Sequence, residues 1–161
     1  MNKNKKGVGY LILFAPVIFI CHFSEETPGF VLWFNQHVHR SINYGLFWDV
    51  NITALVMTVI FSLIEFFTSG AVSDSIVIFW FSFLMLANAV FHITGSLADR
   101  AYMPGLVTAV ILYLPFYFLI TRLIINKHRI RMAFVIAIAC LGALPMLIHG
   151  YMIVFLGDRL F

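Results

Sequence analysis

The chain has 161 residues, of which 62% are hydrophobic and 11% are charged, and its formal net charge is +3. A soluble domain of this size carries about 25% charged and about 45–50% apolar residues, so this composition suits a bilayer better than water. The two cysteines, Cys21 and Cys140, lie in apolar runs, which excludes a disulfide framework or a cysteine metal knuckle. No nucleic-acid signature accompanies the positive charge.

Five segments are long and apolar enough to cross a membrane as helices of about 20 residues. They cover about residues 7–26, 49–69, 74–97, 104–125 and 132–156. No strand-like alternation of polar and apolar residues is present, so a barrel is disfavoured. The sequence therefore predicts an all-α integral membrane helical bundle that forms one transmembrane domain over residues 1–161.

The segment 30–48, between the first two spans, is too polar to cross a membrane. It contains aromatic residues of the kind that settle at the level of the lipid headgroups, among them Trp33, Tyr44 and Trp48. We expect an interfacial helix or loop on the outer face of the membrane.

The placement of lysine and arginine predicts the orientation of the bundle. With a cytoplasmic N-terminus, the cytoplasmic side receives Lys3, Lys5, Lys6, Arg122, Lys127, Arg129 and Arg131. The other side receives Arg40, Arg100 and Arg159. We therefore expect the N-terminus in the cytoplasm and the C-terminus outside.

The first span ends in His22, Glu25 and Glu26, which project from one helix face at i, i+3 and i+4. Two adjacent carboxylates at a helix C-terminus repel each other and also meet the negative end of the helix dipole. Their charge has to be compensated by a metal ion, a trapped proton, a protonated histidine, or Arg40 or Arg100.

The topology brings further polar residues to the same membrane depth. His92 lies 18 residues after Asp74, or about 27 Å along a helix, which places it near the outer end of the third span. Asn88 precedes His92 by one turn on the same stripe. The same side also receives His149, Tyr102, Pro104 and Gly105.

Three motifs follow one another along the chain: His22-Phe23-Ser24-Glu25-Glu26, then His92, then Tyr102-Met103-Pro104-Gly105. In these residues the sequence resembles, over about residues 10–120, the HXXEE-domain membrane proteins. That bacterial family is recognised by an HxxEE motif, a further histidine and a YxPG motif. The resemblance implies a multi-pass protein of the bacterial inner (cytoplasmic) membrane and no particular activity, since the function of the family is not established. His149 lies outside these motifs.

Histidine and carboxylate side chains at one depth suit a divalent metal, with zinc favoured over iron. The expected metal ligands are His22, Glu26, His92 and His149. The expected catalytic residues are Glu25, Glu26 and His92. The expected supporting residues are Asn88, Tyr102, Pro104 and Gly105.

We favour a metal-dependent membrane enzyme that hydrolyses a lipid-like substrate at the outer membrane boundary. Two alternatives stay open: a small proton-coupled carrier, and a structural subunit in which the His/Glu cluster is a static lock. The expected partners are the lipid bilayer and a lipid-like small molecule. Five spans give the carrier no inverted repeat, which an oligomer of this chain would repair. Glu65 lies too deep for the outer cluster, so it either snorkels to the inner interface or bonds to a neighbouring helix.

Overall fold

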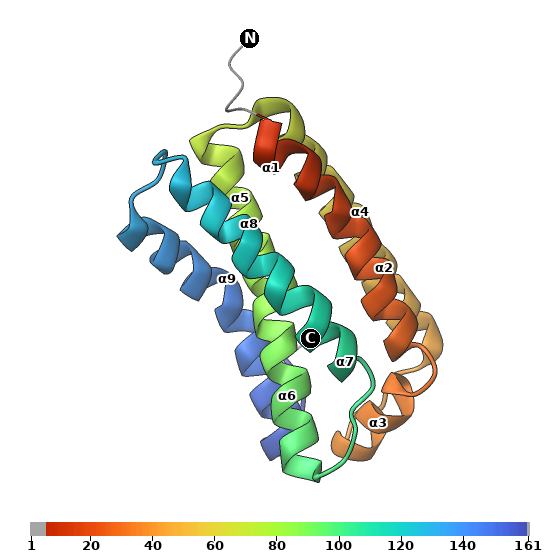
Figure 1. Cartoon of the computed structure of the whole chain (residues 1–161). Coiled ribbons are helices and arrows are strands. Elements are labelled where there is room, and N and C mark those ends of the chain that lie inside the picture. The colour runs from red at the N-terminus through yellow and green to blue at the C-terminus, as the bar shows by residue number, and fades with distance from the viewer. Residues whose placement is uncertain (1–5, 161) are drawn as a thin grey trace.

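The computed structural model describes residues 6–160 and is all-helical over that range, in agreement with the predicted fold class (Figure 1). Five of its helical segments are long and apolar enough to cross a membrane. They are Val8–Glu26, Tyr44–Thr68, Ala71–Asp99, Leu106–Asn126 and Met132–Leu156. Their surfaces carry many exposed apolar side chains, such as Phe67, Val72 and Phe118, which suits a bilayer environment.

Several of the spans combine more than one helical element. The first comprises α1 (Lys6–Leu11), η2 (Ile12–Phe14) and α2 (Ala15–Glu26), and the short helix α3 (Phe30–His37) follows it. The second is α4 (Tyr44–Thr68), and the third comprises α5 (Ala71–Phe81), the π-helical η3 (Ser82–Ala87) and α6 (Asn88–Asp99). The fourth comprises α7 (Leu106–Thr108), the π-helical η4 (Ala109–Tyr113) and α8 (Leu114–Asn126), and the fifth comprises α9 (Met132–Tyr151) and the π-helical η5 (Met152–Leu156).

The two ends of the bundle differ in what they contain (Figure 1). One end, here called the α3 end, holds α3, the last turns of α2 and α6, and the start of α7. The opposite end holds α1, the turn from α4 to α5, and the loop from α8 to α9. Residues far apart in the sequence therefore meet at each end.

Local hydrogen bonds explain why two spans begin earlier than expected. The Asn43 side chain accepts a hydrogen bond from Leu46 N over 2.8 Å, so α4 begins at Tyr44 and takes the last residues of the segment 30–48. Gly70 N donates to Ser73 Oγ over 2.9 Å, which starts α5 at Ala71. These side-chain caps satisfy backbone groups that a helix terminus leaves open.

The third span is the central helix of the bundle, because more than half of it is buried while the other four spans are mostly exposed to their surroundings. Phe81 and Met85 pack there with Phe19 and Tyr113 in one apolar core. The fifth span packs tightly against it at Gly142, where an added Cβ would lie 2.2 Å from the Phe79 carbonyl oxygen. Small residues allow such close packing of membrane helices.

Two contacts fix α3 and the linker at residues 101–105 against the bundle. Asp99 at the end of α6 accepts hydrogen bonds from Trp33 Nε1 over 2.7 Å and lies 2.9 Å from His37 Nε2. Pro104 packs on the turn between α2 and α3, where an added Cβ on Gly29 would lie 3.0 Å from Pro104 Cγ. The linker is thereby held over the end of α2.

Candidate functional site

His22, Glu26 and His92 converge at the α3 end of the bundle. Glu26 Oε1 lies 3.3 Å from His22 Nε2 and 3.0 Å from His92 Nε2. All three residues are buried, with exposed fractions of 1%, 5% and 0% in chain order. His22 and Glu26 share one turn of α2, while His92 comes from α6, so the first and third spans meet in this group.

Gly105, in the linker before α7, lies directly against all three side chains. Its φ of +97° is a conformation that other residues rarely adopt. A Cβ at this position would lie 2.5 Å from His92 Cε1 and 3.0 Å from both Glu26 Cγ and His22 Cε1. Glycine is therefore required here both for the backbone conformation and for the space that the group occupies.

Glu25 faces the start of the fourth span instead of the group. It accepts hydrogen bonds from the Tyr102 hydroxyl over 2.6 Å, from Val107 N over 3.0 Å and from Thr108 N over 2.7 Å. A further bond of 2.5 Å comes from the Thr108 hydroxyl. Partial burial of the phenol, together with the Glu25 carboxylate, raises the pKa of Tyr102 to about 12, so this hydroxyl stays a donor at physiological pH.

Thr108 connects Glu25 to His22. The threonine hydroxyl has one proton, which it donates to Glu25, and an ionised carboxylate can only accept. The 2.9 Å contact between Thr108 Oγ1 and His22 Nδ1 therefore has the imidazole N–H as its donor. A neutral His22 then turns the lone pair of Nε2 toward Glu26.

The nitrogen and oxygen atoms of His22, Glu26 and His92 suit the coordination of a divalent metal ion. The Nε2 lone pair of a neutral His22 and the Glu26 carboxylate are both acceptors, so their 3.3 Å contact needs a proton or a cation. His22 Nε2 and His92 Nε2 are buried and face the Glu26 carboxylate, and His92 Nδ1 is buried without a hydrogen-bond partner among residues 6–160. Ligand atoms on tetrahedral zinc are roughly 3.3 Å apart, given bonds of about 2.0–2.1 Å. His22, Glu26 and His92 offer ligand atoms within 4.8 Å of one another and could hold a metal ion.

A cavity of about 150 Å³ lies beside Glu26, between α3, α4, α6 and α9. Apolar side chains, including Phe30, Phe34 and Phe47, form most of its wall. Its polar lining residues are Glu26, Asn51, Asn88, His149 and Arg159. Two further lining residues, Leu46 and Val50, are exposed on the outer surface of α4, so the cavity adjoins the lipid-facing surface.

His149 and Asn88 line this cavity, and His149 does not join His22, Glu26 and His92. Leu160 N donates to His149 Nδ1 over 3.2 Å, which makes Nδ1 an acceptor. A histidine that binds a metal through one nitrogen usually donates through the other, so this bond does not favour His149 as a ligand. Asn88 is 9% exposed, and its Oδ1 has no hydrogen-bond partner in the described chain.

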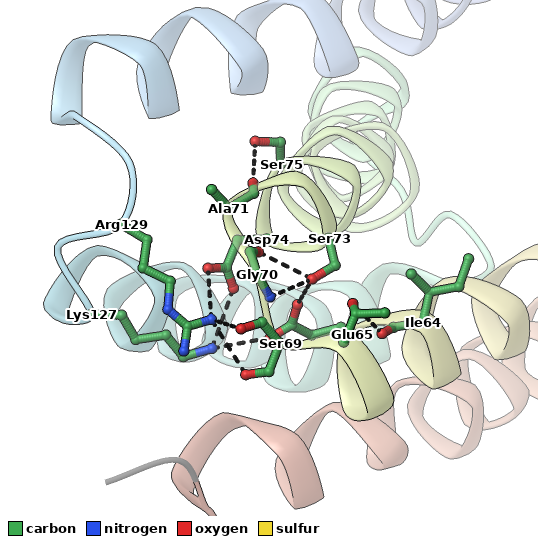
Figure 2. Close-up of polar contacts among 11 residues, drawn as sticks. Ile64, Glu65, Ser69, Gly70, Ala71, Ser73, Asp74, Ser75, Lys127 and Arg129 are labelled. Atoms are coloured by element: carbon green, nitrogen blue, oxygen red, sulfur yellow. Dashed lines mark hydrogen bonds and ion pairs between the residues drawn. The ribbon is translucent and has the colours of Figure 1, made fainter.

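A second polar cluster occupies the opposite end of the bundle (Figure 2). Lys127 Nζ lies 3.0 Å from Glu65 Oε1 and 3.2 Å from Asp74 Oδ1, and both carboxylates are fully buried. Ser73 donates to Glu65 over 2.5 Å, and Arg129 adds an ion pair to Asp74 at 3.7 Å. Glu65 thus bonds to neighbouring elements, which was one of its two expected roles, and the cluster ties the α4–α5 turn to the α8–α9 loop.

Sequence reasoning missed Thr108, Arg159 and the partners of Glu65. Thr108 carried a weak signal, since it is a hydroxyl residue in an apolar run three positions after Gly105. Arg159 and Lys127 had none, because each reaches its cluster from a loop or tail whose path depends on the whole bundle.

The fold and the site together define a small multi-pass membrane protein with a buried His/Glu group at one end of its helical bundle. The chain belongs to the family described as proteins of unknown function with an HXXEE motif, whose model matches residues 13–120. No curated protein and no solved structure matches the chain.

Proposed function

We propose that the protein is a metal-dependent membrane hydrolase that acts on a lipid-like substrate. One observation carries the proposal: two buried imidazoles and a buried carboxylate converge next to a mostly apolar cavity that adjoins the lipid-facing surface. His22, Glu26 and His92 would hold the ion, with zinc preferred for this ligand set. A bound zinc ion would supply Lewis-acid polarisation of an ester or amide carbonyl.

Glu26 is the member of the group that also lines the cavity, so it is the proposed catalytic residue. In a hydrolysis, water adds to the carbonyl carbon and the bond to the leaving oxygen or nitrogen breaks. Glu26 would hold the ion through Oε1, which faces both imidazoles, and would use Oε2 to accept the proton from the water and return it to the leaving group. His22 would keep the required tautomer because its Nδ1–H is bonded to Thr108.

Glu25 has a positioning role in this proposal rather than the catalytic one expected from sequence. Its oxygens already accept from Tyr102, Val107 and Thr108, so little of its basicity is left for a substrate. Carboxylates commonly orient a histidine that binds a metal without binding the metal themselves.

The carrier alternative receives less support from the interior of the bundle. A proton path would have to join Glu26 at the α3 end to Glu65 at the opposite end. The described core between them contains many apolar side chains such as Phe19, Phe81 and Ile120, and its buried hydroxyls of Ser82 and Tyr117 lie 3.0 Å from each other. A polar route through the bilayer would need ionisable or hydrated groups there.

Elemental mass spectrometry of the purified protein tests the proposal. Near-stoichiometric zinc is expected in the wild type and in His128→Ala, a control that removes an exposed loop histidine. Glu26→Gln and His92→Ala are expected to lose the metal while they retain a cooperative thermal transition. Wild-type protein that stays metal-free after incubation with zinc would overturn the proposal and favour the static lock.

A further inference from the structure

The cavity beside Glu26 has polar lining residues that the proposed hydrolysis does not use. Asn88, His149 and Arg159 are among them. These residues come from α6, α9 and the segment after η5, so the chain brings three separate elements to one small space.

Hydrogen bonds hold the segment after η5 against the bundle, and this places Arg159 at the cavity. Gly157 reverses the chain with a φ of +68°. On one side of Arg159 the Gly157 carbonyl accepts from His39 N over 2.9 Å, and on the other side Leu160 N donates to His149 Nδ1 over 3.2 Å. Arg159 is therefore held by its neighbours.

Among the residues that line the cavity, Arg159 is the one that favours an anionic ligand. The carboxylate of Glu26 faces His92 Nε2 over 3.0 Å and His22 Nε2 over 3.3 Å. The guanidinium of Arg159 has no carboxylate within ion-pair distance among residues 6–160, although it lines the same space. A partly buried arginine of this kind suits a carboxylate or phosphate that arrives with the ligand.

Asn88 adds a second requirement. Its side chain is nine-tenths buried, it lines the cavity, and Oδ1 has no hydrogen-bond partner within the described chain. A buried acceptor without a donor is unfavourable, so a ligand that offers an N–H or O–H would bind better than one that does not.

The volume limits how much of the ligand is enclosed. A cavity of about 150 Å³ holds a group about as large as benzene. Only the head of an amphiphile fits, and the exposed lining residues Leu46 and Val50 offer a way out for its hydrocarbon chain. The bilayer is the apolar medium available on that side.

We propose that this cavity binds the head of a single-chain amphiphile in which an anionic group lies close to a hydrogen-bond donor, as in an N-acyl amino acid. Arg159 pairs with the anion, Asn88 accepts from the donor, and the acyl chain extends along α4 into the bilayer. The inference rests on the proposed function for its reaction, since the amide of such a ligand would lie on the side of Glu26. Its binding step does not depend on a metal.

Equilibrium binding of tritiated N-oleoylglycine to the chelator-treated, full-length protein in detergent micelles tests this proposal. N-oleoylglycine methyl ester removes the anion, and oleoyl glycolate replaces the N–H by oxygen. Each is expected to compete about 10-fold or more weakly than N-oleoylglycine. Equal competition by all three would overturn the proposal.

Matched variants assign the contacts. Arg159→Gln is expected to weaken binding of N-oleoylglycine about 10-fold and to abolish the preference for acid over methyl ester. Asn88→Ala should abolish the preference for amide over ester. Arg40→Gln, which removes an exposed charge at the same end, should bind like the wild type. If Arg40→Gln lowers binding as much as Arg159→Gln, the effect is general electrostatics and the assigned site is wrong.

The two proposals fail separately. Binding with the expected preferences in a protein that never takes up zinc would leave this inference standing and remove the metal-dependent hydrolase. If His22, Glu26 and His92 bind zinc and the protein shows no preference among the three ligands, the metal-dependent hydrolase stands and this inference is removed.

Discussion

The Thr108 hydroxyl determines which nitrogen of His22 faces Glu26. Because it donates to Glu25 and accepts from His22 Nδ1, it transmits the charge of a carboxylate outside the group to an imidazole inside it. A change at Thr108 should therefore alter metal binding without removing a ligand.

Thr108→Val keeps the shape of the side chain and removes the hydroxyl. We expect zinc affinity to fall about 10–100-fold, as is typical when a partner of a ligating histidine is lost. Thr108→Ser, which keeps the hydroxyl, should stay near the wild type. Zinc titration with a competing chelator measures the affinity of both variants. Equal affinities in Thr108→Val and the wild type would show that the Thr108 hydroxyl has no effect on the zinc site.

Gly105→Ala tests the close approach of the linker to the group. The added methyl would clash with His92 at 2.5 Å, and alanine would be strained at a φ of +97°. Backbone strain alone costs about 1–3 kcal/mol, so the midpoint of thermal unfolding should fall. Gly9→Ala is the control, since its nearest neighbour would be Phe66 at 3.7 Å and alanine suits a helix. A Gly105→Ala protein as stable as Gly9→Ala would contradict the assigned packing.

Helical elements could be predicted well from the sequence, and their partners could not. The i, i+4 spacing of His22 and Glu26 places both on one face of α2, and the structure has them 3.3 Å apart. Glu25 at i+3 was expected on that face too. In the structure it faces helix α7 instead, and the α7 residues Val107 and Thr108 donate hydrogen bonds to it. Hydropathy locates a span, but the neighbour that covers each face depends on how all five spans pack.

The partners of Glu65 and Asp74, in the cluster that joins the α4–α5 turn to the α8–α9 loop, could not be predicted from the sequence either. Glu65 and Asp74 are both fully buried, and Lys127 reaches them from a loop more than fifty residues away. Two buried carboxylates are stable there only because cations from the loop compensate them.

Lys127→Met should therefore destabilise the bundle by about 3–5 kcal/mol, because it leaves buried carboxylates without their closest cation. Thermal unfolding in detergent measures the loss. Arg122→Met, which removes an exposed charge on the neighbouring helix, should have little effect. Adding Glu65→Gln to Lys127→Met should recover part of the stability. If the double variant is no more stable than Lys127→Met, the loss does not come from uncompensated charge.

At the scale of the whole molecule, the two polar clusters make the two ends of the bundle chemically different. The α3 end holds the His/Glu group and the cavity, and the opposite end holds the lysine and arginine residues of the α8–α9 loop. The excess of basic residues at that opposite end predicts that it faces the cytoplasm. The proposed substrate would then enter from the outer leaflet.

Labelling with a membrane-impermeant maleimide tests this orientation in a Cys21→Ser, Cys140→Ser background. Gln36→Cys places a thiol on the exposed side of α3, and His128→Cys places one in the exposed α8–α9 loop. We expect Gln36→Cys to react in intact cells and His128→Cys to react only after lysis, because the charged reagent does not cross the bilayer. The reverse pattern would invert the topology and place the His/Glu group on the cytoplasmic side, where a lipid-like substrate would have to come from the inner leaflet.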